Sequence, residues 1–259
     1  MTKRWEILLK YCRFLHDGQV KYGMIDVDRV VEFMGSFLDD PAVPTDRLYH
    51  LNEVKLLAPL EPKQLIAIGL NYKDHAIEQS KPLPEEPMMF MVSPSAVIGP
   101  DETIQLAKPD HRIDYEAELA IVIGKTAYQV SEADALDYVF GYTIAVDVSD
   151  RDLQNRDRQY TRAKSYATYK PLGPVVETDL RPNKVKIQLK QNGDLKQDGH
   201  TSDMVHSVEK MIAHVTEVIT LEPGDVILTG TPAGVGPLHK GDKIETTIEG
   251  IGTLVNDVD

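Results

Sequence analysis

Short runs of apolar residues recur along most of the chain, and their spacing predicts a protein built mainly from β-strands. Each run is rich in isoleucine, valine and leucine, which fit the pleated and buried surface of a sheet. We expect strands at residues 65–70, 115–125, 143–152, 225–232 and 242–257. The continuous apolar character of residues 115–125 predicts a strand that is covered on both faces.

Turn and helix signals complete this pattern. Residues 185–199 have a period-two pattern around an Asn-Gly pair, which favours a tight hairpin because both residues tolerate a positive φ. Helical spacing is clearest over residues 203–220, where apolar side chains form a single stripe. Shorter helical segments are predicted at residues 73–79 and 131–142.

The first 57 residues form a separate group of short elements. Apolar positions flank the turn at residues 16–18, which predicts two short strands, and loops bearing Pro and Asp follow them. We therefore place a small N-terminal β-containing domain at residues 1–57 and a larger domain at residues 58–259. Because strands outnumber helices, the predicted class is mixed α/β and β-rich, a rolled or barrel-like mixed sheet flanked by a few helices.

Composition narrows the range of partners. The 259 residues include 28 Lys and Arg against 41 Asp and Glu, a formal net charge of −13, which disfavours binding to nucleic acid or an anionic membrane. No run reaches the roughly 18 apolar residues of a membrane span, and charged residues interrupt the first segment too often for a signal peptide. We expect a soluble, cytoplasmic protein. The single cysteine, Cys12, allows no intrachain disulfide or thiolate zinc site, and we expect it in the core.

Two glutamates stand out within the strand predicted at residues 115–125. Glu116 and Glu118 are two positions apart, so their side chains project from the same side of the strand. Neighbouring carboxylates repel one another unless a cation lies between them. The pair is therefore a candidate metal site, and the alternative is a solvated strand face or an edge protected by charge.

A third carboxylate follows in an apolar segment. Asp147 lies within the strand predicted at residues 143–152, where a lone aspartate is unusual. Together with Glu116 and Glu118 it would form an all-oxygen ligand set, which suits Mg²⁺ or Mn²⁺ rather than zinc. The alternative is an aspartate at the end of a strand that caps the following turn.

His75 and Glu78 form the second candidate pair. Three residues apart on a helical turn, their side chains lie on one face and can touch. A carboxylate on the imidazole fixes its tautomer and raises its basicity, as a general base requires. The alternative is an ordinary pair on an exposed helix.

Several common motifs are missing. The segment GTPAGVGP contains Gly234 and Gly236, but the third glycine of a dinucleotide fingerprint would fall at His239. Patterns of the Walker A, HExxH and G-x-S-x-G types are also absent. These absences disfavour dinucleotide binding, P-loop chemistry, zinc proteolysis and a serine elbow.

One ordered set of segments carries a resemblance: GLNYKDHAIE, FMVSPSAVIGP, DYEAELAIVIGK, GYTIAVDVSDRDLQ, RAKSY and GDVILTGTPAGVG. Over about residues 58–257 the chain resembles the fumarylacetoacetate hydrolase family. The resemblance implies a β-roll core of mixed strands, a homodimer, and Mg²⁺ or Mn²⁺ held by Glu116, Glu118 and Asp147. In the acylpyruvase-like branch it also implies a dyad on a lid helix that orients the attacking water, here His75 and Glu78.

The resemblance assigns further residues to the substrate. Lys164 of the RAKSY segment would lie within substrate reach, Arg151 would bind substrate, and the turn of Gly230 and Thr231 would line its end. Two positions depart from the family pattern. Val92 replaces a lysine that many relatives carry, and Asp150 is an additional acid. We expect both to weaken the grip on a second substrate carboxylate.

The implied activity is hydrolysis of a C–C bond in a small β-diketo acid, such as acetylpyruvate or fumarylpyruvate, through an enolate stabilised by the cation. Two alternatives use the same site: decarboxylation of oxaloacetate, and isomerisation of a 2-hydroxyhepta-2,4-diene-1,7-dioate. A non-catalytic scaffold of the same fold is a further alternative. Clustered buried carboxylates argue against the scaffold, because they are costly without a function.

Overall fold

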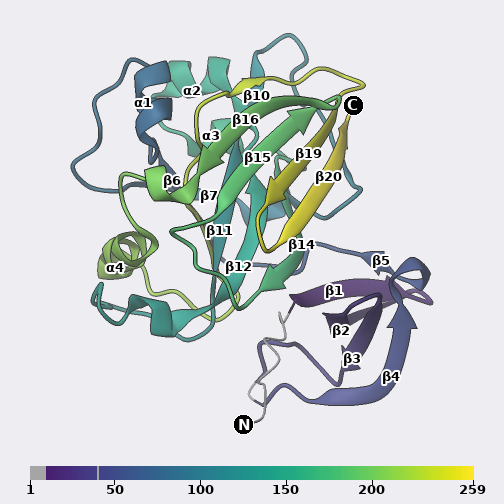
Figure 1. Ribbon diagram of the computed structural model, residues 1–259. Helices are drawn as coiled ribbons and strands as arrows, with labels where there is room; N and C mark the ends of the chain where they lie inside the picture. Colours follow the sequence, from purple (N-terminus) through teal and green to yellow (C-terminus); the bar gives the residue numbers. More distant parts are fainter. Residues whose placement is uncertain (1–9, 40) are drawn as a thin grey trace.

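A computed structural model describes residues 10–39 and 41–259, and within this part it contains twenty strands and four α-helices. The class is therefore mixed and β-rich, as predicted. Most strands surround a common interior, and α1 (Lys73–Glu78), α2 (Arg151–Asp157) and α3 (Thr161–Lys164) gather at one end of it (Figure 1). In the described residues no helix has the length and apolar character needed to cross a membrane.

The largest sheet has twelve strands and runs from the N-terminal segment into the centre of the molecule. Its main path is β4-β3-β2-β1-β14-β12-β11-β17-β6-β7, and β5 and β8 pair with β1 and β14. Pairing is antiparallel except for β17 with β6 and β14 with β8. The strands outside the N-terminal segment are β6 (Leu65–Gly69), β7 (Met88–Val92), β8 (Val97–Ile98), β11 (Ala117–Ile123), β12 (Val139–Val146), β14 (Lys170–Glu177) and β17 (Val226–Leu228).

The N-terminal segment forms a meander at the lower right of Figure 1. Its strands are β1 (Lys10–His16), β2 (Gln19–Asp26), β3 (Arg29–Phe33), β4 (Pro44–His50) and β5 (Lys55–Leu56). The predicted hairpin joins β1 and β2 through Asp17 and Gly18, which both have positive φ. Cys12 on β1 is fully buried, as expected, and burial raises the pKa of its thiol to about 12.

Two smaller sheets complete the roll. One has five strands in the order β16-β15-β19-β20-β9, and the other has three in the order β13-β10-β18. The hairpin of β15 and β16 turns at Asn192 and Gly193, both at positive φ as its sequence predicts. The strands of these two sheets are β9 (Thr103–Ile104), β10 (Ile113–Tyr115), β13 (Ser149–Asp150), β15 (Lys186–Gln191), β16 (Asp194–His200), β18 (Gly236–Pro237), β19 (Lys243–Ile248) and β20 (Gly252–Val258).

Strand β11 lies inside the core, and all seven of its residues are buried. Leu119 and Ile121 pack in one hydrophobic cluster, whereas Ala120 and Val122 pack in the second cluster on the opposite face. Burial on both faces explains why this strand is apolar at successive positions instead of alternating. It also carries Glu118 into the interior.

The helices differ from the sequence predictions in two places. Helix α4 (Val208–Val218) begins later than the predicted helix at residues 203–220. It is capped by Ser207, whose hydroxyl accepts a hydrogen bond from Lys210 N. The prediction of a helix at residues 131–142 is wrong. Only a 3₁₀ turn forms (Ala135–Tyr138), and β12 begins at Val139, because this segment pairs with β11 and tertiary pairing outweighs local helical spacing.

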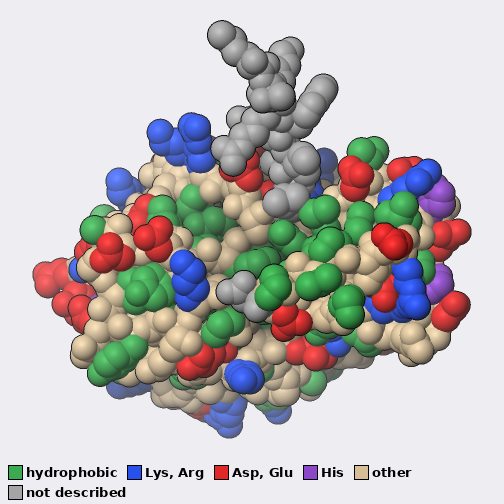
Figure 2. Space-filling model, turned by 90° about the horizontal axis from the view of Figure 1, so that it is seen from below, with side chains coloured by type: hydrophobic (Ala, Val, Ile, Leu, Met, Phe, Trp, Pro, Cys, Tyr) green, Lys and Arg blue, Asp and Glu red, His purple; other side chains and the backbone are tan. Residues whose placement is uncertain are grey.

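Apolar side chains are also found on the surface. Figure 2 shows the face seen from below, where hydrophobic side chains lie among charged ones. In the N-terminal meander, Val20, Val27, Met34 and Leu48 are exposed. The meander therefore shields its apolar residues less completely than the central sheet does.

Candidate active site

The three predicted carboxylates meet at one point in the interior. Glu116 lies between β10 and β11, Glu118 is on β11, and Asp147 directly follows β12. The Asp147 N–H donates to the Glu116 carbonyl at 2.8 Å, which places the two residues side by side across neighbouring strands. Each residue has a carboxylate oxygen within 4.8 Å of the others, and the residues are 4%, 2% and 1% exposed. A solvated strand face is therefore excluded.

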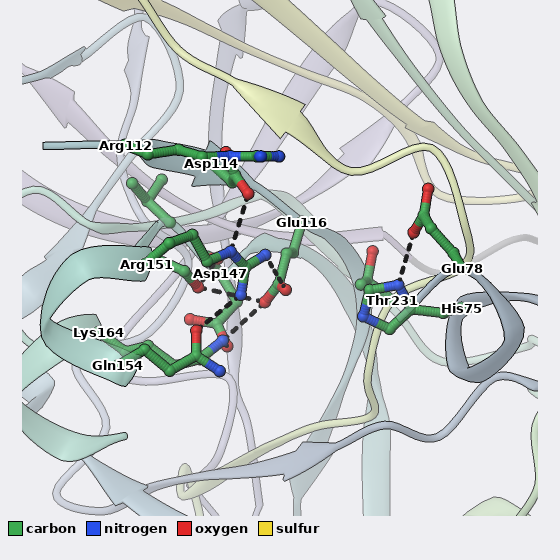
Figure 3. Close-up of polar contacts among 12 residues, drawn as sticks. His75, Glu78, Arg112, Asp114, Glu116, Asp147, Arg151, Gln154, Lys164 and Thr231 are labelled. Carbon is green, nitrogen blue, oxygen red and sulfur yellow. Dashed lines mark hydrogen bonds and ion pairs between the residues drawn. The ribbon is translucent and has the colours of Figure 1, made fainter. Parts of the chain in front are cut away.

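Cationic side chains contact two of these carboxylates (Figure 3). Lys164 Nζ lies 2.6 Å from both Glu116 Oε2 and Asp147 Oδ2, so its ammonium group bridges them. Lys170 Nζ lies 2.7 Å from Asp147 Oδ1, and Arg151 Nη2 lies 2.6 Å from Glu116 Oε1. The cluster thus already holds positive charge between its carboxylates.

Glu118 has a different environment. Its Oε2 accepts a hydrogen bond from Gly230 N at 2.7 Å, and it makes no ion pair in the described part of the chain. Burial and the charges of Asp147 and Glu116 raise the pKa of Glu118 well above its usual range. Burial also raises the pKa of Glu116, but Arg151 and Lys164 outweigh this effect and lower it far below its usual range.

The donor set fits a hard divalent cation. Three buried carboxylates offer only oxygen atoms, which Mg²⁺ and Mn²⁺ prefer. Burial and the repulsion from Asp147 and Glu116 raise the pKa of Glu118, and a cation at this point would offset both effects. A metal site is therefore consistent with the chemistry of the residues present.

His75 and Glu78 also touch, as predicted. His75 Nδ1 lies 2.9 Å from Glu78 Oε2, and the ring of His75 lies between Glu78 and Thr231 (Figure 3). Glu78 is anchored in turn, because its Oε1 accepts a hydrogen bond from Gly234 N at 3.0 Å. His75 is only 6% exposed, so this is not a pair on an exposed helix face.

One pocket brings the predicted residues together. Its lining includes all nine except Glu78, which contacts the pocket through His75; the eight are His75, Glu116, Glu118, Asp147, Arg151, Lys164, Gly230 and Thr231.

Three of these residues already contact other side chains of the same chain. Arg151 Nε lies 2.8 Å from Asp114 Oδ2, in addition to its bond to Glu116. The Gly230 N–H is directed to Glu118, and Thr231 Oγ1 accepts a hydrogen bond from Gln197. These contacts give Arg151, Gly230 and Thr231 a structural role around the carboxylates.

The two departures from the family pattern lie away from the pocket. Val92 ends β7 and is buried in an apolar cluster. Asp150 caps α2 by accepting from Leu153 N at 3.0 Å, and His111 Nδ1 lies 2.7 Å from its other oxygen. Neither side chain lines the pocket, which removes the expected reason for a weaker grip on a second carboxylate.

The structure adds residues that the sequence did not indicate. Lys170 is buried beside Asp147, and a lysine opening an apolar strand is the signal that could have revealed it. Asp114 precedes Glu116 with the same two-residue spacing that joins Glu116 to Glu118. Lys81 and Gln197 gave no signal, because each is an ordinary residue in its own segment.

The fold and the site together define a β-rich protein with a candidate metal-dependent active site. Residues 64–259 match the profile of the fumarylacetoacetate (FAA) hydrolase C-terminal domain, and residues 9–59 match the Rv2993c-like N-terminal profile. The chain therefore belongs to the fumarylacetoacetate hydrolase family.

Named relatives are similar over most of the chain. Oxaloacetate tautomerase YisK of Bacillus subtilis is 44% identical, over 83% of this chain and 78% of its own. Mitochondrial oxaloacetate tautomerase fahd2 of Xenopus laevis is 41% identical, over 80% of this chain and 69% of its own. The crystal structure of 2-hydroxyhepta-2,4-diene-1,7-dioate isomerase from Mycobacterium marinum has a TM-score of 0.90 at 38% identity, covering 96% of this chain and 98% of that one.

Proposed function

We propose that this protein is a divalent-metal-dependent enzyme that moves a proton within a small 2-oxo diacid. The reaction would convert a keto form to an enol, or shift a double bond next to the oxo group. The observation that carries the proposal is the contact of Glu78 with the buried His75, which lines the same pocket as the carboxylate cluster. The names of the similar proteins, two tautomerases and an isomerase, favour proton movement over bond cleavage.

Glu116, Glu118 and Asp147 are the residues that would hold Mg²⁺ or Mn²⁺, and such a cation would supply a Lewis acid that polarises the 2-oxo group. Lys164 would hold both Glu116 and Asp147 in place and Lys170 would hold Asp147, since their ammonium groups contact these carboxylates. Lys164 is thus proposed to act next to the ligands and to add positive charge near the substrate.

His75 would perform the proton transfer. Glu78 would accept a hydrogen bond from the Nδ1–H group. The Nε2 atom would then keep a free lone pair and could act as a base. Nε2 would take a proton from the carbon next to the oxo group, and the electron pair left behind would form the enol double bond. The protonated imidazole would then return this proton to the oxo oxygen, so His75 ends as it began. No atom is lost, so substrate and product have equal mass.

A second acid group on the substrate would meet Lys81. Of the lysines and arginines that line the pocket, Lys81 is the one without an ion pair in the described part of the chain. Arg151 and Lys164 are both neutralised by carboxylates. The free ammonium of Lys81 therefore favours a diacid over a monoacid.

Hydrolysis of a C–C bond in an acylpyruvate is the second candidate. The same geometry supports it, because a base held by Glu78 can also deprotonate a water molecule, which would attack the distal carbonyl. Release of a 2-oxo acid enolate would complete the cleavage. Decarboxylation of oxaloacetate needs no water and would yield pyruvate and CO₂.

One panel separates these reactions. Mn²⁺-loaded protein is given oxaloacetate, a hydroxy-dienedioate, acetylpyruvate and fumarylpyruvate, with enol content followed by ultraviolet absorbance and products by mass spectrometry. We expect accelerated interconversion at unchanged mass. Acid plus pyruvate as the sole products would contradict the proposal and establish the hydrolase, and pyruvate plus CO₂ from oxaloacetate would establish a decarboxylase.

We further propose a homodimer, as the family resemblance implies, with a small oxo acid as substrate and a location in the cytoplasm. The net charge of −13 supports the proposal that neither nucleic acid nor an anionic membrane is a partner. Light scattering behind size exclusion measures the first point. A mass of twice 29.0 kDa is expected, and a monomer at all concentrations would contradict it. Cell fractionation checks the location.

A further inference from the structure

Gln197 is a buried polar residue outside the predicted site that contacts both halves of it. Its side chain on β16 is fully buried. Its Oε1 accepts from Ala117 N at 2.9 Å, and its Nε2 donates to Thr231 Oγ1 at 2.8 Å and to the Pro232 carbonyl at 2.9 Å. The amide therefore uses both N–H groups and its oxygen within the protein.

The first of these bonds reaches the carboxylate cluster. Ala117 is the residue between Glu116 and Glu118, so a hydrogen bond to its N–H fixes the backbone from which both side chains project. Because Gln197 belongs to the five-stranded sheet and Ala117 to the twelve-stranded sheet, the bond also joins two sheets at the site.

The other two bonds reach the loop that supports the proton-transfer pair. This loop continues from Thr231 and Pro232 to Gly234, whose N–H donates to Glu78 at 3.0 Å. Glu78 in turn holds His75 Nδ1 at 2.9 Å. A continuous series of hydrogen bonds and short backbone segments thus runs from Gln197 to the imidazole.

Close packing keeps the loop against β16. A side chain at Gly234 would collide with the Lys196 carbonyl, and one at Gly199 would collide with the ring of Pro232. Gly234 also has a φ of +96°, which glycine adopts without strain. The loop therefore cannot shift along β16 without breaking the bonds to Gln197.

We propose that Gln197 is a positioning residue that sets the distance between the carboxylate cluster and the His75–Glu78 pair. The physical reason is that proton transfer depends on near-contact geometry, and a misplacement of about 1 Å can cost roughly 100-fold in rate. A buried amide with all its groups satisfied holds one geometry, because each lost bond leaves an unpaired polar group in the interior. The effect on turnover rests on the proposed function, whereas the effect on geometry does not.

Hydrogen exchange measured by mass spectrometry tests the geometry without any substrate. In Gln197→Met, which keeps the approximate volume but forms none of the bonds, we expect about tenfold faster exchange in peptides covering residues 116–118, 230–234 and α1. Gln188→Met is the matched control, since Gln188 lies on the neighbouring strand and its amide reaches only the exposed Asp198. Unchanged exchange at residues 230–234 and α1 would overturn the proposal.

Gln197→Glu keeps the acceptor for Ala117 N–H but replaces the amino group that donates to Pro232. We expect faster exchange at residues 230–234 and α1 with residues 116–118 unchanged. This variant decides the question if the methionine variant does not fold. Uniformly faster exchange over the whole chain would mean general destabilisation and would contradict the proposal.

A double-mutant cycle tests the effect on turnover. Gln197→Met should lower kcat by about 10- to 100-fold. It should change KM less than about threefold, since none of the Gln197 hydrogen bonds reaches Lys81. In a His75→Ala background the same change should lower the residual kcat less than about twofold. Equal losses in both backgrounds would overturn the positioning role. If no oxo acid is turned over by the wild type, the proposed function fails, and the exchange result still decides the inference.

Discussion

The two walls of the pocket hold their charged residues in different ways. On the wall made by β10, β11 and β12, Glu116 and Asp147 are buried and paired with Lys164, Lys170 and Arg151. On the opposite wall, α1 is held by hydrogen bonds from backbone N–H groups to its acidic side chains, Gly234 to Glu78 at 3.0 Å and Ala233 to Asp74 at 3.3 Å.

This difference separates two kinds of chemistry. Ion pairs inside the protein give a stiff arrangement, because any displacement leaves a buried charge unpaired. The hydrogen bonds on the opposite wall contribute about 1.5–3 kcal/mol each, because their acceptors are carboxylates, and α1 depends on the loop that Gln197 holds in place. The cation site is thus built into the rigid, ion-paired wall, while the group that determines the reaction lies on the hydrogen-bonded wall.

The largest expected effect comes from the rigid wall. Glu118→Gln keeps the volume and an acceptor for Gly230 N–H but removes the charge, so we expect loss of measurable Mn²⁺ binding by calorimetry and a fall in kcat of about 1,000-fold. Glu217→Gln, on the exposed side of α4, is the control. Full turnover by Glu118→Gln in metal-free buffer would contradict the metal site.

A change on the hydrogen-bonded wall should affect only the chemistry. His75→Ala should lower kcat by about 100-fold through loss of the base, with Mn²⁺ affinity within about threefold of wild type. Calorimetry and steady-state kinetics on the same preparation check this split. If metal affinity fell together with kcat, the two walls would not be independent.

The raised pKa of Glu118 predicts a pH dependence of the metal-free protein. Above the ordinary value of 4.5, the unfolded chain has released this proton while the folded protein still holds it. The free energy of unfolding therefore falls as the pH rises through this window. The lowered pKa of Glu116 acts in the opposite sense and only at more acidic pH.

Denaturant unfolding in chelator between about pH 5 and 8 measures this slope. Glu118→Gln should flatten it, and saturating Mn²⁺ should reverse it, because the metal binds the ionised carboxylate. A slope that is the same in wild type and variant would assign the pH dependence to other groups.

The smallest effect is expected at the rim. Lys81→Met should raise KM for a diacid by about two- to fivefold, the value of one exposed ion pair, and leave KM for a monoacid unchanged. Lys73→Met, at the start of α1 and away from the pocket lining, is the matched control. An equal change for both acids would remove Lys81 from substrate selection.

Local spacing explains which site residues could be predicted. Alternation along a strand aligns Glu116 with Glu118, and the helical repeat brings Glu78 to His75, so both pairs are visible in a few consecutive residues. The assignment of all three carboxylates to one metal depended on the resemblance. The expected helix at residues 131–142 failed because the pairing partner of β12 lies outside any local window.

The surroundings of the site could not be read in the same way. Lys164 lines the pocket, and its ammonium lies between Glu116 and Asp147, a position that requires α3 to pack beside β13. Val92 and Asp150 were expected to affect the pocket, but they belong to an apolar cluster and a helix cap. Residues of the same type have different roles in different places, and only the residues packed around them show which role each one has.

The sequence by itself determined the strand-rich class, the hairpins and the local pairs of site residues, because these depend on periodicity and turn chemistry within short segments. The tertiary structure decided which charges are neutralised, where Lys81 stands free, and how Gln197 joins two sheets. These features depend on burial and on contacts between segments up to 80 residues apart, as for Ala117 and Gln197. Such contacts are set by the packing of whole sheets, and no local pattern encodes them.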